Sequence, residues 1–277
     1  MNTLMLLALL AAPFEVQVHP APGKPPMILI PGLSSHGKVW DATVGHLKGR
    51  FEMHVLTLGG FAGAAPLADR ANFLAQQREA VAAYIREKKL AKPVMVGHSL
   101  GGFLALSIAA KHPELTGPLV IVDSLPFLTA VYQPGATAET ARSYAESMKS
   151  MTLAQKGEGW AAYNKANPVL GMWLTREEDR ARVAQWGVES DAATVAEAMF
   201  DLMTTDLRGE MAKIGQKTLV FAALKGMPAA AVETYRAQFA GLRGVRVEPM
   251  TEARHFVMYD DPERMHALMD EFLGVSR

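Results

Sequence analysis

The stretch VMVGHSLGGFLALSIAAKH, residues 94–112, joins a short apolar segment to a longer one. Its beginning predicts a buried strand and its remainder a helix, with a proline on either side to delimit them. The pentapeptide GHSLG at 97–101 matches the pattern G-x-S-x-G, with Ser99 at its centre. A serine on a sharp strand-to-helix turn projects its hydroxyl above the sheet, and flanking glycines remove side chains that would collide. We therefore predict Ser99 as a nucleophile and the N–H of Leu100, at the helix start, as an oxyanion donor.

Short apolar runs alternate with helical patterns along most of the chain, which is typical of βαβ units. The runs that predict strands lie at 14–18, 27–30, 53–58, 94–98, 119–123, 218–223 and 245–250. Helical periodicity appears at 70–90, at 100–112, around 230–239 and after Pro262. Runs that are apolar throughout, such as 119–122, indicate strands buried on both faces of a central sheet. The sequence thus predicts an α/β fold with a mostly parallel sheet flanked by helices.

The alternation is interrupted between residues 126 and 205, where the sequence is helical and contains no convincing strand. We interpret this segment as a helical cap inserted into a core domain formed by residues 14–125 and 206–277. The cap segment is rich in large apolar residues, among them Trp160, Trp173 and Trp186. Such residues fit either the interior of the cap or the wall of an apolar pocket.

Composition excludes several classes of protein. The chain has 277 residues, 28 Lys and Arg against 28 Asp and Glu, and no cysteine. The absence of cysteine rules out disulfides, thiolate zinc sites, iron–sulfur clusters and a cysteine nucleophile. A net charge of zero argues against a nucleic-acid partner, which would require a basic face.

The N-terminal segment MNTLMLLALLAA, residues 1–12, is apolar and is followed by Pro13. It is shorter than the roughly 20 residues that span a bilayer, so no integral membrane span is predicted. It resembles the apolar part of a signal peptide, but it has no basic residue before it and Pro13 is a poor cleavage context. Two interpretations of residues 1–13 stay open, a signal peptide remnant or a segment packed on the body. A periplasmic or secreted location and a cytoplasmic one therefore stay open too.

Three motifs together resemble the α/β-hydrolase superfamily: VGHSLGG at 96–102, ILIPGLSSHGKVW at 28–40 and EARHFVMYDDPERM at 252–265. The resemblance covers most of 14–125 and 206–277, and it implies the α/β-hydrolase fold with a helical cap. It also implies a second oxyanion donor, the backbone N–H of Leu33, in the loop after the strand at 27–30. Relatives usually have His-Gly before this position, whereas this chain has Pro31-Gly32.

The base and the acid follow from the same resemblance. His255 lies in a loop after the strand at 245–250, where the family places its catalytic histidine, so we assign it as general base. Most relatives carry the acid after the strand equivalent to 218–223, but residues 224–228 include no carboxylate. Some members place it one strand earlier, where this chain has Asp123, and the order Ser99, Asp123, His255 fits the family. Two alternatives stay open, namely that Asp123 is a loop anchor and that the pair works without a carboxylate.

These residues predict a cofactor-free serine hydrolase that cleaves carboxylic esters through an acyl-enzyme on Ser99. The predicted partner is a small apolar ester-like substrate, and no cofactor or metal site is predicted. Acidic pairs at 177–178 and 260–261 are interpreted as solvated charges at helix starts. The pattern carries no signal for oligomeric state.

Two other functions stay open. An aminopeptidase or amidase on the same fold would need an acidic anchor for a substrate amine within the cap. The carboxylates that could serve are Glu139, Glu146 and Glu158. A catalytically weak, ligand-binding homologue would keep the fold, and the missing acid after 218–223 is the one feature in its favour. The presence of both Ser99 and His255 favours an ester hydrolase over a catalytically weak homologue.

Overall fold

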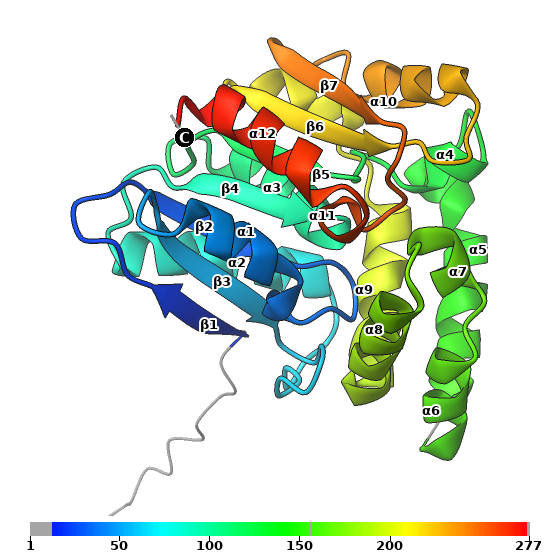
Figure 1. Cartoon of the computed structure of the whole chain (residues 1–277). Helices are drawn as coiled ribbons and strands as arrows, with labels where there is room; N and C mark the ends of the chain where they lie inside the picture. Colours follow the sequence, from blue (N-terminus) through cyan, green and yellow to red (C-terminus); the bar gives the residue numbers. More distant parts are fainter. Residues whose placement is uncertain (1–12, 156, 276–277) are drawn as a thin grey trace, which may run out of the picture.

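The computed structural model of the protein describes residues 13–155 and 157–275, so residues 1–12 of the apolar N-terminal segment, whose two interpretations were left open, lie outside the described residues. Seven strands form one sheet in the order β1-β3-β2-β4-β5-β6-β7 (Figure 1). The edge strand β1 pairs antiparallel with β3, and all the other neighbouring strands pair in parallel. The strands are β1 (Phe14–His19), β2 (Pro26–Ile30), β3 (Glu52–Leu58), β4 (Val94–His98), β5 (Leu119–Val122), β6 (Thr218–Ala223) and β7 (Val245–Met250).

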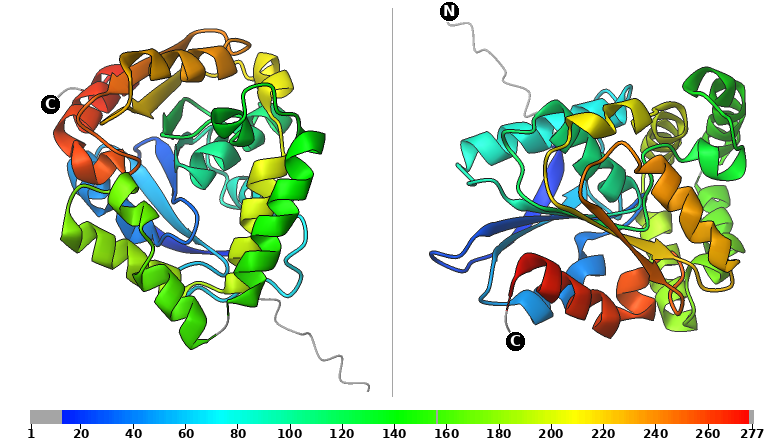
Figure 2. Two further views of the ribbon diagram at one scale, coloured as in Figure 1. Left: turned by 90° about the vertical axis from the view of Figure 1, so that its right-hand side faces the viewer. Right: turned by 90° about the horizontal axis from the view of Figure 1, so that it is seen from above.

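The central strands are buried on both faces, which explains why their sequences are apolar without interruption. Along β2, for example, Ile28 and Ile30 belong to one hydrophobic cluster, whereas Met27 and Leu29 belong to another. This alternation follows from the two-residue period of a strand. Helices α1 (Asp41–Leu47), α11 (Val257–Asp260) and α12 (Pro262–Leu273) cover one face (Figure 2). Helices α2 (Phe73–Glu87), α3 (Leu100–Lys111) and α10 (Val232–Gln238) cover the other.

The predicted mostly parallel sheet and its flanking helices are confirmed, with boundaries that differ by a few residues. The sequence analysis missed α1 and the 3-10 turn at Gly37–Trp40 before it. These elements span too few residues to show helical periodicity. The sequence-based helix at 70–90 is longer than the observed α2, because residues before Phe73 form a turn and residues after Glu87 form a second one.

Between β5 and β6 the described residues form helices with connecting turns and no strand, and residues 126–205, interpreted from sequence as a cap, lie here. The α-helices are α4 (Thr129–Tyr132), α5 (Ala138–Ala154), α6 (Glu158–Lys165), α7 (Val169–Trp173), α8 (Glu177–Glu189) and α9 (Ala192–Thr204), and a 3-10 helix at Arg208–Lys213 follows them. Helix α5 packs along α9, and α6 packs on α8. The cap lies beyond the carboxyl ends of the parallel strands (Figures 1 and 2). In a parallel α/β sheet this is the end at which ligands bind.

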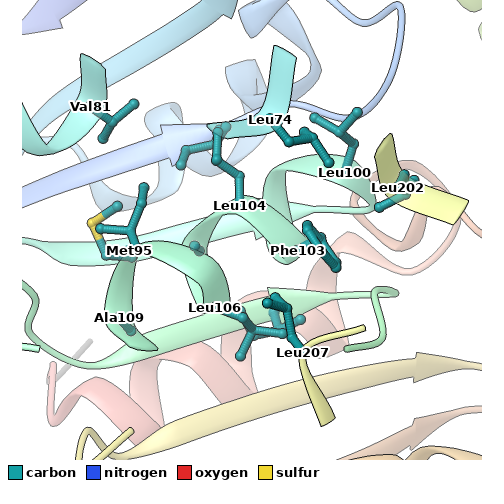
Figure 3. Close-up of a cluster of buried hydrophobic side chains, with 14 of the residues drawn as sticks. Leu74, Val81, Met95, Leu100, Phe103, Leu104, Leu106, Ala109, Leu202 and Leu207 are labelled. Carbon is teal, nitrogen blue, oxygen red and sulfur yellow. The ribbon is translucent and has the colours of Figure 1, made fainter. Parts of the chain in front are cut away.

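One end of the cap is fixed to the hydrophobic core. Leu202 of α9 and Leu207, just beyond it, lie with Leu74 of α2 and with Leu100 and Phe103 of α3 (Figure 3). All five are buried, so the cap and the sheet share one continuous core. Within the described ranges 13–155 and 157–275, no helix has the length and apolar character needed to cross a bilayer.

Candidate active site

Ser99 stands on the turn between β4 and α3, in a backbone conformation that the neighbouring glycines permit. Its φ is 52° and its ψ is −120°, a strained region for a residue with a side chain. A Cβ on Gly97 would lie 2.2 Å from the carbonyl oxygen of Gly101, and one on Gly101 would lie 2.3 Å from that of Ile30. Only hydrogen fits at these two positions. The turn, residues 97–101, is called the elbow below.

One predicted oxyanion donor, Leu100, belongs to the elbow, and the other, Leu33, lies in a loop that contacts it. Leu100 is the first residue of α3, so its N–H belongs to the first turn, where no intrahelical acceptor exists. A Cβ on Gly32 would lie 3.2 Å from the Cβ of Ser99, which brings the loop carrying Leu33 against the serine. The proline at position 31 does not displace this loop from the elbow. The donor roles of Leu33 and Leu100 stay predictions.

The structure brings Asp123 and His255 into direct contact. Asp123 follows the last residue of β5, and its Oδ2 lies 2.6 Å from Nδ1 of His255. The other oxygen, Oδ1, accepts hydrogen bonds from the N–H of Ala223 at 2.9 Å and the hydroxyl of Tyr235 at 2.5 Å. A positive φ of 47° at Asp123 turns the chain at this point. The alternative role as a loop anchor is therefore also visible, because the same carboxylate bonds Ala223.

His98 links the elbow to the loop that carries His255, residues 251–256, which is called the histidine loop below. Its Nε2 lies 3.0 Å from the carbonyl oxygen of His255, so Nε2 carries the proton and donates it. Burial, reinforced by the nearby His255, holds the pKa of His98 well below its usual 6.5. The ring is therefore neutral at working pH. The two imidazole rings stand 4.6 Å apart, which places His255 beside the residue that precedes Ser99.

The cap also holds the histidine loop. The N–H of Phe256 donates to the carbonyl of Trp173 at 3.3 Å, and the indole of Trp173 lies 5.3 Å from the His255 ring. Asp260 accepts hydrogen bonds from the N–H of Arg254 at 2.9 Å and from the N–H and hydroxyl of Thr175 at 3.1 and 2.9 Å. The interpretation of Asp260 as a solvated charge is therefore wrong. Its carboxylate joins the histidine loop to the end of α7.

Four other carboxylates lie away from these contacts. The first carboxylate in sequence after residues 224–228 is Glu233 on α10, which is exposed and pairs with Arg236 one turn away. The three glutamates considered as amine anchors are exposed on the cap: Glu139, Glu146 and Glu158. Glu146 pairs with Arg142 at 3.9 Å on the surface of α5. The exposure of all three favours surface roles over an anchor inside the cap.

The large residues of the cap divide into three groups. Trp160 and Trp186 are buried in the two hydrophobic clusters that also include the strands of the sheet. Trp173 is half-buried and faces His255. A further set is exposed although apolar: Tyr132, Tyr144, Met151, Tyr163 and Met172. The sequence alone could not assign these residues to the interior or to a pocket wall, because helical spacing is the same in both cases.

Sequence reasoning missed Tyr235, Trp173 and Asp260 as neighbours of the predicted site. Tyr235 belongs to a short helix that looks like an ordinary core helix in sequence. Trp173 stands among many cap aromatics, and Asp260 was grouped with the adjacent Asp261. No local signal distinguishes them, since each acts on a residue far along the chain.

Comparison with proteins of known sequence and structure supports the architecture. A pimeloyl-(acyl-carrier protein) methyl ester esterase of Aeromonas hydrophila subsp. hydrophila is 28% identical over 90% of this chain and 96% of its own. A relative from Serratia proteamaculans whose name mentions carbamate hydrolysis is 26% identical over 74% and 75%. The crystal structure of the enol-lactonase from Burkholderia xenovorans LB400 superposes with a TM-score of 0.76 at 18% identity, covering 94% and 96% of the two chains.

The family assignment depends on a match that covers most of the chain. The model that describes the alpha/beta hydrolase family matches residues 27–268, from β2 to the middle of α12. This range includes the elbow, Asp123 and the histidine loop. It also includes the whole helical cap. The resemblance inferred from the three sequence motifs is confirmed, and the protein belongs to the alpha/beta hydrolase family.

Proposed function

We propose that the protein is a cofactor-free serine hydrolase that cleaves carboxylic esters through an acyl-enzyme on Ser99. The observation that carries this proposal is the 2.6 Å contact between Asp123 Oδ2 and His255 Nδ1, in a loop bonded to the elbow residue His98. A hydrolase that uses serine needs an oriented base beside the nucleophile, and this contact supplies the orientation. The methyl ester esterase from Aeromonas supports ester substrates.

The proposed mechanism depends on which ring nitrogen of His255 carries the proton. A carboxylate at Nδ1 keeps the proton on that nitrogen, so Nε2 presents a lone pair and can accept the proton of Ser99. Ser99 Oγ then attacks the ester carbonyl, and the imidazolium returns the proton to the departing alkoxide. A water molecule then gives its proton to His255 and attacks the acyl-enzyme in the same way. The carboxylic acid product leaves and Ser99 regains its proton. The N–H groups of Leu33 and Leu100 stabilise the oxyanion, each by about 3 kcal/mol in the transition state.

The substrate is proposed to be a small ester whose apolar part contacts the cap. In this proposal residues 126–205 form the cap and residues 14–125 and 206–277 form the catalytic domain. Trp173 supports an apolar group near the reaction centre, because its indole lies beside the His255 ring. Aromatic walls with few polar groups are typical of sites that bind apolar ligands.

The test compares the parent protein with Ser99→Ala on chromogenic acyl esters of increasing chain length. We expect the parent to hydrolyse them and Ser99→Ala to lose activity by a factor of about 10⁶. Ser107→Ala is the matched control, because Ser107 is a buried serine on the same helix α3 whose hydroxyl, among the described residues, has Arg78 as its one side-chain partner. It should keep parental activity. Equal activity in the parent and Ser99→Ala would contradict the proposal.

The amidase alternative has one observation in its favour, the carbamate relative from Serratia. The same three proteins should therefore be assayed on matched esters, carbamates and anilides. We expect the ester to be cleaved fastest. Faster turnover of the carbamate or the anilide would replace the ester proposal while keeping Ser99. The ligand-binding alternative predicts no turnover of any substrate by any of the three proteins. The contact between Asp123 and His255 counts against that alternative.

A further inference from the structure

Asp123 reaches His255 across an intervening strand. The sheet order is β5-β6-β7, and Asp123 follows β5 whereas the histidine loop follows β7. The carboxylate therefore extends over the end of β6, where the N–H of Ala223 donates to Oδ1. A carboxylate on two rotatable side-chain bonds needs more than one fixed donor to present a chosen oxygen to an imidazole.

The second donor is Tyr235. Its hydroxyl, from the middle of α10, donates to Oδ1 of Asp123 at 2.5 Å. The two oxygens of Asp123 thereby divide their partners, with Oδ1 bonded to Tyr235 and Ala223 and Oδ2 left for His255. Rotation of the carboxylate about its last bond would break both contacts of Oδ1 at once. The hydroxyl therefore fixes the orientation of the carboxylate, with one oxygen directed at His255.

The tyrosine is well suited to act only as a donor. Its ring packs against the cluster of Ala222, Leu224 and Val232, which fixes its direction. Burial and the charge of Asp123 raise the pKa of the Tyr235 hydroxyl well above its usual 10. The hydroxyl thus keeps its proton at every pH at which an esterase of this kind is assayed, and a neutral donor so placed always supports the ionised carboxylate.

We infer that Tyr235 is a positioning residue for the reaction, whose hydroxyl holds the carboxylate of Asp123 so that Oδ2 faces His255. The inference depends on the proposed function, because it assigns Tyr235 a role in orienting the proposed base. It touches neither substrate nor the reacting atoms. It also explains how an acid at the end of β5 can serve in a chain that has no carboxylate at 224–228.

The test begins with Tyr235→Phe, which keeps the packed ring and removes only the hydroxyl. We expect kcat on the best ester to fall about tenfold while KM stays within twofold, because the lost bond acts on the base and not on substrate binding. The matched control is Tyr84→Phe. The Tyr84 hydroxyl makes a comparable 2.7 Å contact with Nδ1 of His54, on the part of the sheet near β1. This control should change stability but not kcat.

A second pair of variants separates an effect through Asp123 from general damage. Asp123→Asn should lower kcat by roughly 10⁴ if Asp123 is the proposed acid, because its amide would stabilise the wrong imidazole tautomer. In that background Tyr235→Phe should leave kcat unchanged or raise it, since a freed amide can turn its oxygen toward Nδ1. A further tenfold loss in the double variant, or parental kcat in Tyr235→Phe alone, would overturn the inference. Parental activity in Asp123→Asn would instead overturn the acid assignment within the proposed function.

Discussion

Ser99 and His255 are carried by two segments that His98 links to each other, and the two segments are held by different means. The elbow around Ser99 is shaped by backbone contact: the missing side chains of Gly97 and Gly101 let β4, α3 and the loop after β2 approach one another. The histidine loop is held by polar contacts from four separate places, namely the β5 end through Asp123, the loop after β6 through the N–H of Lys225, the elbow through His98 and the cap through Trp173.

The geometry of the two segments is therefore determined by two different kinds of interaction. The geometry of the elbow is determined within a few residues and depends on close packing, which tolerates no added atom. The geometry of the histidine loop depends on hydrogen bonds between segments far apart in sequence, each of which contributes about 1 kcal/mol. The proposed nucleophile, Ser99, should therefore lose its position only when packing is broken. The proposed base, His255, should respond in graded steps to changes in the cap and in the neighbouring helices.

The largest effect is expected from an added methyl group in the elbow. In Gly101→Ala the new Cβ would lie 2.3 and 2.5 Å from the carbonyl oxygens of Ile30 and Pro31, and neither backbone atom can move without displacing β2. We expect the variant to lose more than about 3 kcal/mol of unfolding free energy, together with its esterase activity. Urea unfolding measures the first and an ester assay the second.

Gly45→Ala is the control for that variant. Gly45 lies on the exposed side of α1, and a Cβ there would meet no atom within 4 Å. Alanine should raise stability by about 0.5–1 kcal/mol, because it restricts the unfolded chain and favours the helix. If Gly101→Ala were as stable and active as Gly45→Ala, backbone contact would not determine the elbow.

The same contrast explains what the sequence could and could not predict. Strands buried on both faces are apolar runs, and the elbow is a pentapeptide, so the sheet and Ser99 are visible in local pattern. His255 and Asp123 could be assigned only because the family resemblance says where in the chain to look. Tyr235 could not be assigned from the sequence, because its partner Asp123 lies 112 positions away. A tyrosine on a helix that bonds such a partner also has the same spacing as a tyrosine that only packs in the core.

An intermediate effect is expected from the link between cap and histidine loop. Asp260→Ala removes an acceptor shared by Thr175 and Arg254, and it leaves the elbow untouched. We expect a loss of about 2 kcal/mol of unfolding free energy and a several-fold lower kcat, since His255 becomes less well oriented. Urea unfolding measures the change in unfolding free energy, and an ester assay measures kcat.

Glu263→Ala provides the comparison for Asp260→Ala. Glu263 is an exposed carboxylate in the first turn of α12, three residues further along. Its loss should cost about 0.5 kcal/mol through the helix dipole and leave kcat unchanged. If Asp260→Ala kept parental kcat, the cap would be shown to hold the loop without orienting the base.

The smallest effect concerns α12, the helix that follows the histidine loop and is held to α1 by a histidine cluster. His266 contacts the hydroxyl of Thr43 at 3.1 Å and stacks on His46 at 4.5 Å, while His46 and Arg50 both bond Asp270. Burial, with a smaller contribution from His46, lowers the pKa of His266 from 6.5 to about 4. The folded protein thus keeps this ring neutral under conditions in which the unfolded chain protonates it.

Acid should therefore weaken this attachment. Between pH 6.5 and 4 the unfolded chain binds more protons at position 266 than the folded chain does, so stability falls as the pH is lowered through that range. From pH 7 to 5.5, the parent should lose about 1 kcal/mol more unfolding free energy than His266→Gln, which can still bond Thr43 but does not titrate. The buried His98 contributes acid sensitivity of the same sign, but it is present in both proteins, so the difference between their urea-unfolding curves isolates α12. Equal losses in the two proteins would contradict the lowered pKa of His266, because the ring would then bind its proton equally well in the folded and the unfolded chain.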